Sequence, residues 1–125
     1  MSDHPHAARY REMSAAMNAG DMSGLDSAIA DDVVWWEIGA AEPVRGKQAL
    51  MARMQDLSDF NITAQLHDVV ANDDHLIAMV SVEATKGDAK LHYRTAEIHH
   101  VNADGQVTER WAFSDDTQAI IDFFQ

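Results

Sequence analysis

A change in the spacing of apolar residues near the middle of the chain is the feature that most constrains its fold. In the first half, Tyr10, Met13 and Met17 follow the three- and four-residue spacing of one helical face. From Phe60 onward, apolar and polar residues alternate, which is the pattern of strands with one buried face. Helices followed by a run of strands favour an α+β domain in which the helices cover one face of the sheet.

The first half predicts three helices and one short strand. The first helix ends at Asn18–Gly20, where glycine is a favourable C-cap. A shorter helix is expected over residues 22–29, and a third from Lys47 to about Leu57. Between them, the β-branched and aromatic run Val33–Glu37 predicts a strand.

The second half predicts four long strands in an antiparallel meander. Turn-forming residues separate the strands at positions 72–74, 86–88 and 102–105. A short helix is expected to begin after Ser114. We therefore predict a single domain over residues 1–125, with a ligand pocket on the concave face of the sheet.

Charge and composition narrow the choice of partners. With 21 acidic and nine basic residues, the net charge of −12 repels nucleic-acid phosphates and anionic lipids. No apolar run approaches the roughly 18 residues of a membrane span, and the polar N-terminus does not resemble a secretory signal. We expect a cytoplasmic protein that binds neither nucleic acid nor membranes. The chain has no cysteine and its seven histidines lack metal-ligand spacing, so we expect no metal and no other cofactor.

The predicted strand from Leu91 to Val101 carries a candidate acid–base pair. Alternation places Tyr93, Thr95, Glu97 and His99 on one of its faces. A histidine two residues from a carboxylate on the same face can share a proton with it and act as an acid or a base near neutral pH. The alternatives are a hydrogen-bonded surface or interface histidine, and an ion pair between the glutamate and a cation such as Arg110.

Four segments resemble those of known proteins. Asn18–Asp21, Ile29–Trp35 and Glu42–Gly46 resemble the opening of SnoaL-like and ketosteroid isomerase-like proteins of the nuclear transport factor 2-like superfamily, and Asp104–Trp111 resembles their last turn and strand. The resemblance implies a cone-shaped fold, with a curved, mixed but mainly antiparallel sheet on three N-terminal helices around a pocket. It also implies a homodimer through the outer face of the sheet. The superfamily includes isomerases, dehydratases, epoxide hydrolases, polyketide cyclases and non-catalytic proteins, so it implies fold more specifically than activity.

The comparison with ketosteroid isomerase implies roles for particular positions. Its general-base aspartate falls on Glu37, and its proton-bearing aspartate falls on Glu97. The tyrosine of its oxyanion hole falls on Met13, which cannot donate a hydrogen bond, although Tyr10 lies one helical turn earlier. This departure argues against steroid isomerisation itself. Arg94–Glu97 lacks the Arg-x-Asp spacing of the epoxide hydrolases.

Two glutamates in one apolar cavity would support proton transfer. Burial and mutual repulsion would raise the pKa of at least one carboxyl group, leaving one ionised base and one neutral donor. That pairing suits proton abstraction beside a carbonyl group, or dehydration. Either glutamate can instead be a solvated or ion-paired structural residue. The expected substrate-binding residues are Tyr10, Met13, Met17, Trp35, Met54, Phe60, Tyr93 and Trp111.

The sequence therefore predicts a protein with a pocket for a small hydrophobic molecule. The candidate catalytic residues are Glu37, Glu97 and His99, for an acid–base isomerase, cyclase or dehydratase acting on a carbonyl-containing, polyketide-like or steroid-like substrate. One alternative is a non-catalytic binder of a hydrophobic metabolite, and another is a dimerisation module with a vestigial pocket. Convergence of two titrating groups on the cavity would favour the enzyme, and a closed cavity would favour the module.

Overall fold

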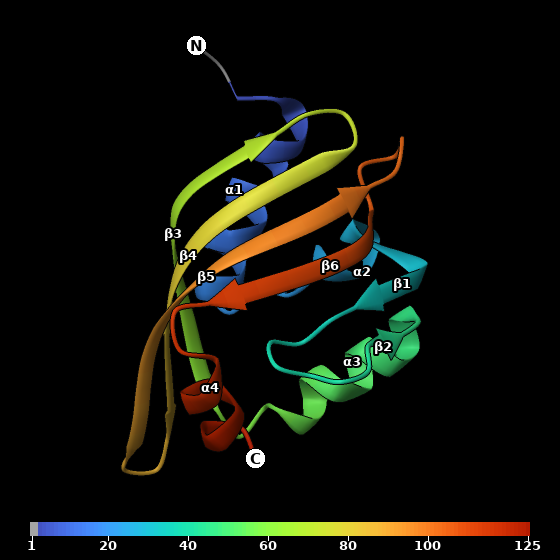
Figure 1. Cartoon of the computed structure of the whole chain (residues 1–125). Helices are drawn as coiled ribbons and strands as arrows, with labels where there is room; N and C mark the ends of the chain where they lie inside the picture. Colours follow the sequence, from blue (N-terminus) through green and yellow to red (C-terminus); the bar gives the residue numbers. More distant parts are fainter. Residues whose placement is uncertain (1–2) are drawn as a thin grey trace.

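The computed structural model describes residues 3–125 and contains a curled six-stranded sheet with helices on its inner side (Figure 1). The strand order is β2-β1-β6-β5-β4-β3, and the two edge strands do not pair, so the sheet stays open. The predicted α+β class is confirmed, including the mixed but mainly antiparallel sheet.

The helices are α1 (Pro5–Asn18), α2 (Leu25–Ala28), α3 (Lys47–Asp56) and α4 (Thr117–Phe123). At the start of α1, the His4 ring accepts a hydrogen bond from the backbone N–H of His6. The second helix is shorter than predicted, because Ile29 opens a strand instead of closing the helix. Ile29 pairs with Val107 and is almost fully buried, so its tertiary contacts override the helical spacing.

The strands are β1 (Ile29–Trp35), β2 (Val44–Arg45), β3 (Asn61–Ala71), β4 (His75–Lys86), β5 (Ala89–Val101) and β6 (Val107–Ser114). The last four form the predicted antiparallel meander. Strand β1 runs parallel to β6 and antiparallel to the two-residue β2, which the sequence did not predict. Glu37 therefore follows the end of β1, where it lies in a loop and not in a strand.

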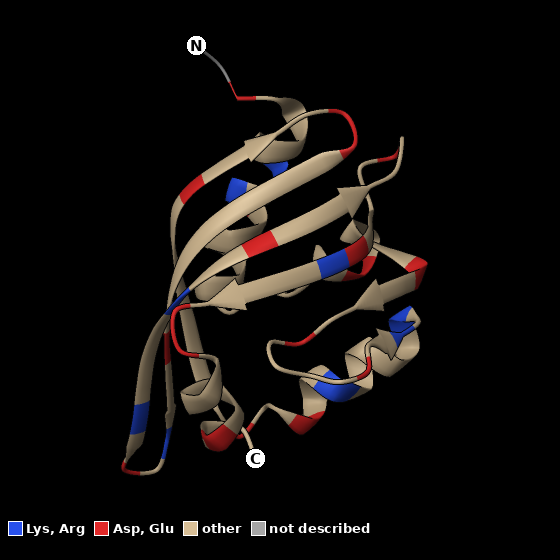
Figure 2. Ribbon diagram, viewed as in Figure 1, with Lys and Arg blue, Asp and Glu red and all other residues tan. Residues whose placement is uncertain are grey.

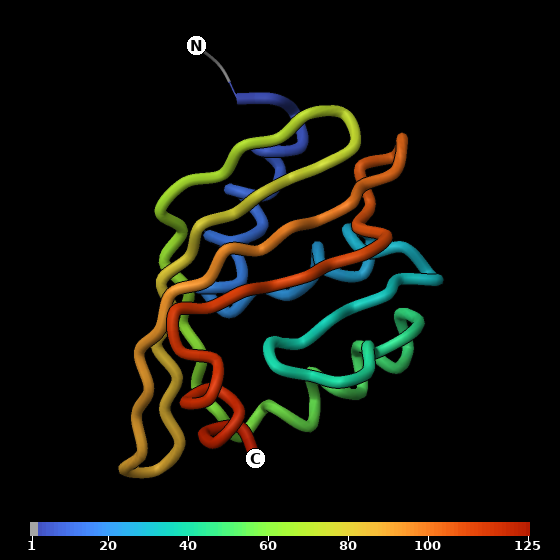
Figure 3. The backbone as a smooth tube through the Cα atoms, viewed as in Figure 1, coloured from blue at the N-terminus to red at the C-terminus, as the bar shows by residue number. Residues whose placement is uncertain are grey.

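Two apolar clusters hold the helices against the sheet. The first joins α1 and α4 to the inner face of the long strands and includes Val69, Leu76, Val80, Tyr93 and Ile120. The second joins α3 to the opposite edge of the sheet and includes Leu25, Ile29, Val33, Leu50 and Val107. The chain trace bends around the space between α3, α4 and the sheet (Figure 3). The candidate site lies in this space.

Candidate functional site

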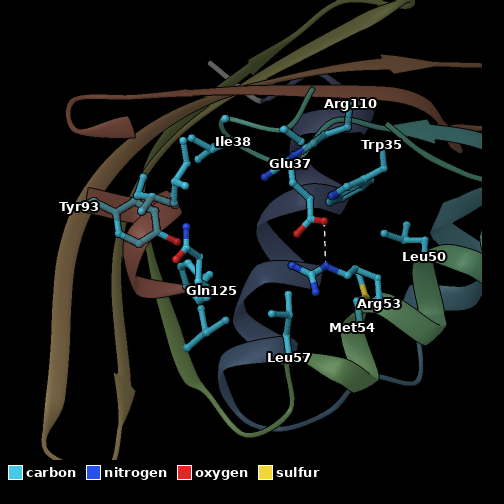
Figure 4. A pocket seen from close by; sticks show the side chains of 16 residues that line it. Trp35, Glu37, Ile38, Leu50, Arg53, Met54, Leu57, Tyr93, Arg110 and Gln125 are labelled. Carbon is cyan, nitrogen blue, oxygen red and sulfur yellow. Dashed lines mark hydrogen bonds and ion pairs between the residues drawn. The ribbon is translucent and has the colours of Figure 1, made fainter. Parts of the chain in front are cut away.

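A cavity of about 510 Å³ lies among α3, α4, the loop after β1 and the inner face of β5 and β6 (Figure 4). Its polar side chains are Glu37, Arg53, Tyr93, Arg110 and Gln125. The larger apolar side chains of the wall are Trp35, Ile38, Leu50, Met54, Leu57, Ile62, Ile120, Ile121 and Phe124. An apolar cavity with a few converging polar groups is typical of a small-molecule site.

An ion pair between Glu37 and Arg53 crosses one side of the cavity. Arg53 lies in the last turn of α3, and its Nε donates a hydrogen bond of 2.8 Å to Glu37 Oε1. Both side chains are about one-third exposed, at 30% for Glu37 and 37% for Arg53. Gly39 turns the loop with a φ of 78°, and a Cβ there would lie 2.6 Å from Ile121 of α4. A side chain at position 39 would therefore clash with α4.

A second polar group, formed by Glu97, His99 and Arg110, lies deeper in the fold. The Glu97 carboxylate lies 3.3 Å from Arg110 Nη2 and 3.4 Å from His99 Nε2. His99 and Arg110 are directly opposite each other on β5 and β6. Arg110 also donates to the backbone oxygen of Trp36 and lies 4.6 Å from the centroid of the Trp35 ring. Arg110 therefore links the buried carboxylate to the cavity wall.

Glu97 is an ionised hydrogen-bond acceptor. Burial by itself would raise the pKa of this carboxyl group, but the hydrogen bond from His99 and the positive charge of Arg110 lower it to about 2. The proton-bearing role that the comparison with ketosteroid isomerase implies for position 97 does not fit this low pKa. Each glutamate has its own cation, Arg53 for Glu37 and Arg110 for Glu97, and Glu97 does not line the large cavity.

The two tyrosines are the neutral donors of this region. Burial, followed by the negative charge of Glu97, raises the pKa of both Tyr93 and Tyr10, so both hydroxyl groups stay protonated near neutral pH. Tyr93 lines the large cavity and faces Glu37 from the other side (Figure 4). Tyr10 stacks edge-on against His99 at 5.4 Å and lines a separate cavity of about 30 Å³.

Four of the predicted site residues meet in the wall of the large cavity: Trp35, Glu37, Met54 and Tyr93. Glu97 and His99 lie together behind this wall. His99 is 3% exposed, which excludes the surface histidine considered as an alternative. The ion pair with Arg110, the structural alternative for Glu97, is present.

The other predicted wall residues lie elsewhere. Met13 and Met17 pack against the second apolar cluster, and Phe60 packs on the Phe123 and Phe124 rings below the cavity. The placement of Trp111 in the wall is wrong. Side chains alternate along β6, so Arg110 faces inward and Trp111 lies beside Ile98 and His100 on the outer face.

Sequence reasoning missed Arg53 and the contribution of α4. Arg53 is three residues from Leu50 and one turn before Leu57, so it shares the inner face that helical spacing assigned to these apolar residues. A charged residue on an otherwise apolar helical face could have indicated that Arg53 belongs to the site. The apolar end of the chain, with Ile121 and Phe124, was a similar signal for α4.

A curled open sheet with helices around one apolar cavity defines a pocket protein of the nuclear transport factor 2-like fold. The chain belongs to the SnoaL-like domain family, whose family model matches residues 10–110. The predicted family is thereby confirmed. Among proteins of curated function, none has a matching sequence.

Solved structures share the fold at low sequence identity. Bal32a from a soil-derived mobile gene cassette is 22% identical, with a TM-score of 0.82 over 96% of each chain. An LEH-like epoxide hydrolase of M. tuberculosis is 16% identical, with a TM-score of 0.75 over 88% of this chain and 82% of its own. A steroid delta-isomerase of Pseudomonas aeruginosa is 19% identical, with a TM-score of 0.71 over 98% and 90%. At these identities the likeness shows the fold alone.

Two further observations concern the described part of the chain. No helix within residues 3–125 has the length and apolar character needed to cross a membrane. Within the same residues, no three histidine or acidic side chains are grouped as metal ligands.

Acid is expected to destabilise the protein through Glu97. Its pKa falls from 4.5 to about 2 on folding, so its contribution is present above pH 4.5 and is lost as the pH drops toward 2. The shift corresponds to about 3 kcal/mol. Urea unfolding between about pH 6 and pH 3 should show a steeper loss of stability in the wild type than in Glu97→Gln. Parallel pH profiles for the two proteins would contradict this assignment.

Proposed function

We propose that this protein is a cofactor-independent acid–base enzyme that isomerises, cyclises or dehydrates a mostly apolar molecule carrying a carbonyl group. The observation that supports this proposal is the position of the Glu37 carboxylate and the Tyr93 hydroxyl on opposite sides of one apolar cavity (Figure 4). Proton abstraction beside a carbonyl group needs a base near the carbon and a donor near the oxygen that gains charge.

In the proposed reaction, Glu37 takes the proton from the carbon beside the carbonyl group. The electron pair of the broken C–H bond moves to the carbonyl oxygen, where Tyr93 donates a hydrogen bond to the enolate. Return of the proton to another carbon gives an isomer, attack of the enolate carbon on a second carbonyl group closes a ring, and loss of a protonated hydroxyl group gives dehydration. Glu97 and His99 do not touch the substrate in this scheme: Glu97 positions Arg110, and His99 hydrogen-bonds to Glu97.

A non-catalytic binder of a hydrophobic metabolite is the second candidate. Met13 supports it. This methionine stands where the comparison with ketosteroid isomerase places the tyrosine of the oxyanion hole, and it has no hydroxyl group to donate a hydrogen bond. The open cavity of about 510 Å³ argues against a vestigial pocket.

Proton exchange tests the proposal without knowledge of the natural substrate. Tetralone, an apolar ketone, should exchange the hydrogens beside its carbonyl group with heavy water in the presence of the protein, as followed by NMR. Glu37→Gln should slow this exchange by about 10²–10⁴-fold, because an amide cannot accept the proton. Glu42→Gln is the matched control, since Glu42 is exposed in the same loop and lies outside the cavity.

Equal exchange rates in Glu37→Gln and the wild type would contradict the assigned base. Thermal stabilisation by tetralone without exchange would favour the non-catalytic binder, because bound ligand raises the melting temperature whether or not it reacts.

We also propose a homodimer formed through the outer face of the sheet. Val70, Ile77, Met79 and Phe113 leave 52%, 39%, 37% and 60% of their surface exposed. Strand pairing places all four on this outer face, which they share with Trp111. A contiguous apolar patch on a sheet face is a common protein interface.

Phe113→Asp is expected to convert the dimer into monomers, because it would place a charge in the desolvated interface. Sedimentation equilibrium gives the mass directly. Met22→Asp is the control, since Met22 is 54% exposed but lies outside the sheet. A monomeric wild type would refute the dimer.

A further inference from the structure

The guanidinium group of Arg53 has donors that the protein does not use. Within residues 3–125 its one polar partner is Glu37, which it contacts through Nε, so both Nη groups are unbonded. The group lies inside the cavity, where Tyr93 and Gln125 face it from the opposite side (Figure 4). A planar guanidinium with free N–H groups suits an anionic oxygen, because charge-assisted hydrogen bonds are stronger than neutral ones.

Arg110 adds a second cation to the same wall. Its Nη groups contact Glu97 and the backbone oxygen of Trp36, whereas its buried Nε has no partner among the described residues. Because Nε is buried away from the cavity surface, Arg110 contributes its positive charge to the wall and not a free donor to a ligand.

The charge of the cavity wall differs from that of the chain as a whole. Acidic residues outnumber basic ones by 21 to nine, and they are spread over the strands, turns and helix ends (Figure 2). The cavity wall itself holds two arginines and one glutamate, and Glu97 lies behind the wall as the partner of Arg110, so the positive and negative charges of this region balance. Arg53 donates to Glu37 only through Nε, so the hydrogen-bond donors of its two Nη groups are left for an anionic oxygen of a ligand.

We infer that the ligand of this cavity carries an anionic oxygen on an apolar skeleton, and that Arg53 is the residue that selects it. The oxygen belongs to a carboxylate or to an ionised enol, which have the same hydrogen-bonding chemistry. This inference rests on the proposed function for the position of the site and adds the class of ligand. It also fits the charge balance of proton abstraction, because Arg53 loses its anionic partner as Glu37 takes up the proton and can then compensate negative charge elsewhere on the bound substrate.

Ligands of similar shape but different charge can show whether the cavity selects an anion. Calorimetric titration of the purified full chain would use naphthoate, its methyl ester, acetylnaphthalene and a β-diketone of the same ring size. The wild type should bind naphthoate about tenfold more tightly than the ester. Arg53→Met should abolish this preference, and Arg53→Lys should retain part of it. Arg45→Met is the control, since Arg45 is exposed and lies outside the cavity.

The affinity of Glu37→Gln for naphthoate is an independent test of the inference. Removing the carboxylate next to Arg53 should strengthen naphthoate binding, because it removes a neighbouring negative charge, and should leave ester binding nearly unchanged. Thermal melts without ligand would show that each variant is folded. Binding of the β-diketone without naphthoate would support the inference and assign the oxygen to an ionised enol.

Other outcomes would overturn the inference in distinguishable ways. If the ester and ketone bind as tightly as the acid, or if Arg53→Met keeps the preference for the acid, Arg53 does not select an anion and the proposed pocket function stands. If none of the probes binds, the apolar ligand pocket and the ligand class are both refuted.

Discussion

Replacing Arg110 with methionine is expected to lower the free energy of unfolding by about 3–5 kcal/mol. The substitution keeps a long apolar side chain against Trp35 but removes the cation that lies 3.3 Å from Glu97. The carboxylate, whose side chain is 14% exposed, would keep His99 as its remaining hydrogen-bond partner. A buried charge that loses its counterion is strongly destabilising, because the carboxylate has already given up its contacts with water.

Urea unfolding near neutral pH measures this loss. Arg94→Met is the matched control, because the Arg94–Asp115 pair is largely exposed, at 73% and 44%, and screened by solvent. It should cost less than about 1 kcal/mol. Adding Glu97→Gln to Arg110→Met should recover part of the stability, since the stranded charge is removed. Equal losses for Arg110→Met and Arg94→Met would show that the buried pair contributes no more than a surface pair.

Leu50→Ala is expected to lower the free energy of unfolding by about 2–5 kcal/mol. Leu50 is 1% exposed and packs with Ile29, Val33 and Val107 in the second apolar cluster. It also lines the large cavity, so truncation removes buried contacts and enlarges the cavity at the same time. The penalty arises from the lost apolar burial and from the empty volume that the surrounding side chains cannot fill.

Thermal and urea unfolding of Leu50→Ala would be compared with Met22→Ala, whose side chain is 54% exposed. The surface substitution should change stability by less than about 0.5 kcal/mol. An apolar ligand that fills the new space should restore part of the melting temperature of Leu50→Ala, because binding to the folded state alone stabilises it. Similar stabilities for the two variants would contradict the assignment of Leu50 to the core.

The predictions from sequence that the structure confirmed rest on local patterns. Alternation along β5 places Tyr93, Thr95, Glu97 and His99 on its inner face, where three of them are below 10% exposed and the Glu97 side chain is 14% exposed. The turns at 72–74, 86–88 and 102–105 separate strands that pair in an antiparallel meander. Such patterns are readable because the spacing of side chains depends on a few neighbouring residues.

The predictions that failed depend on segments that meet only in the folded chain. Ile29 follows a helical pattern, yet pairing with Val107 draws it into a strand. Inward and outward directions on β6 depend on its pairing with β5, which turns Trp111 outward. A one-residue change in phase exchanges the two faces of a strand, so a correct strand prediction can still carry a wrong site residue.

The sequence by itself determined the order of the helices and of every strand except β2, the α+β class, the family and the acidic residues available for chemistry. The tertiary structure alone decided which cation each carboxylate meets, Arg53 for Glu37 and Arg110 for Glu97. These partners are 16 and 13 positions apart along the chain, on different elements, so helical or strand spacing carries no information about their distance. Their approach in the fold also determines ionisation, because the pKa of a buried carboxyl group depends on the charges that packing brings beside it.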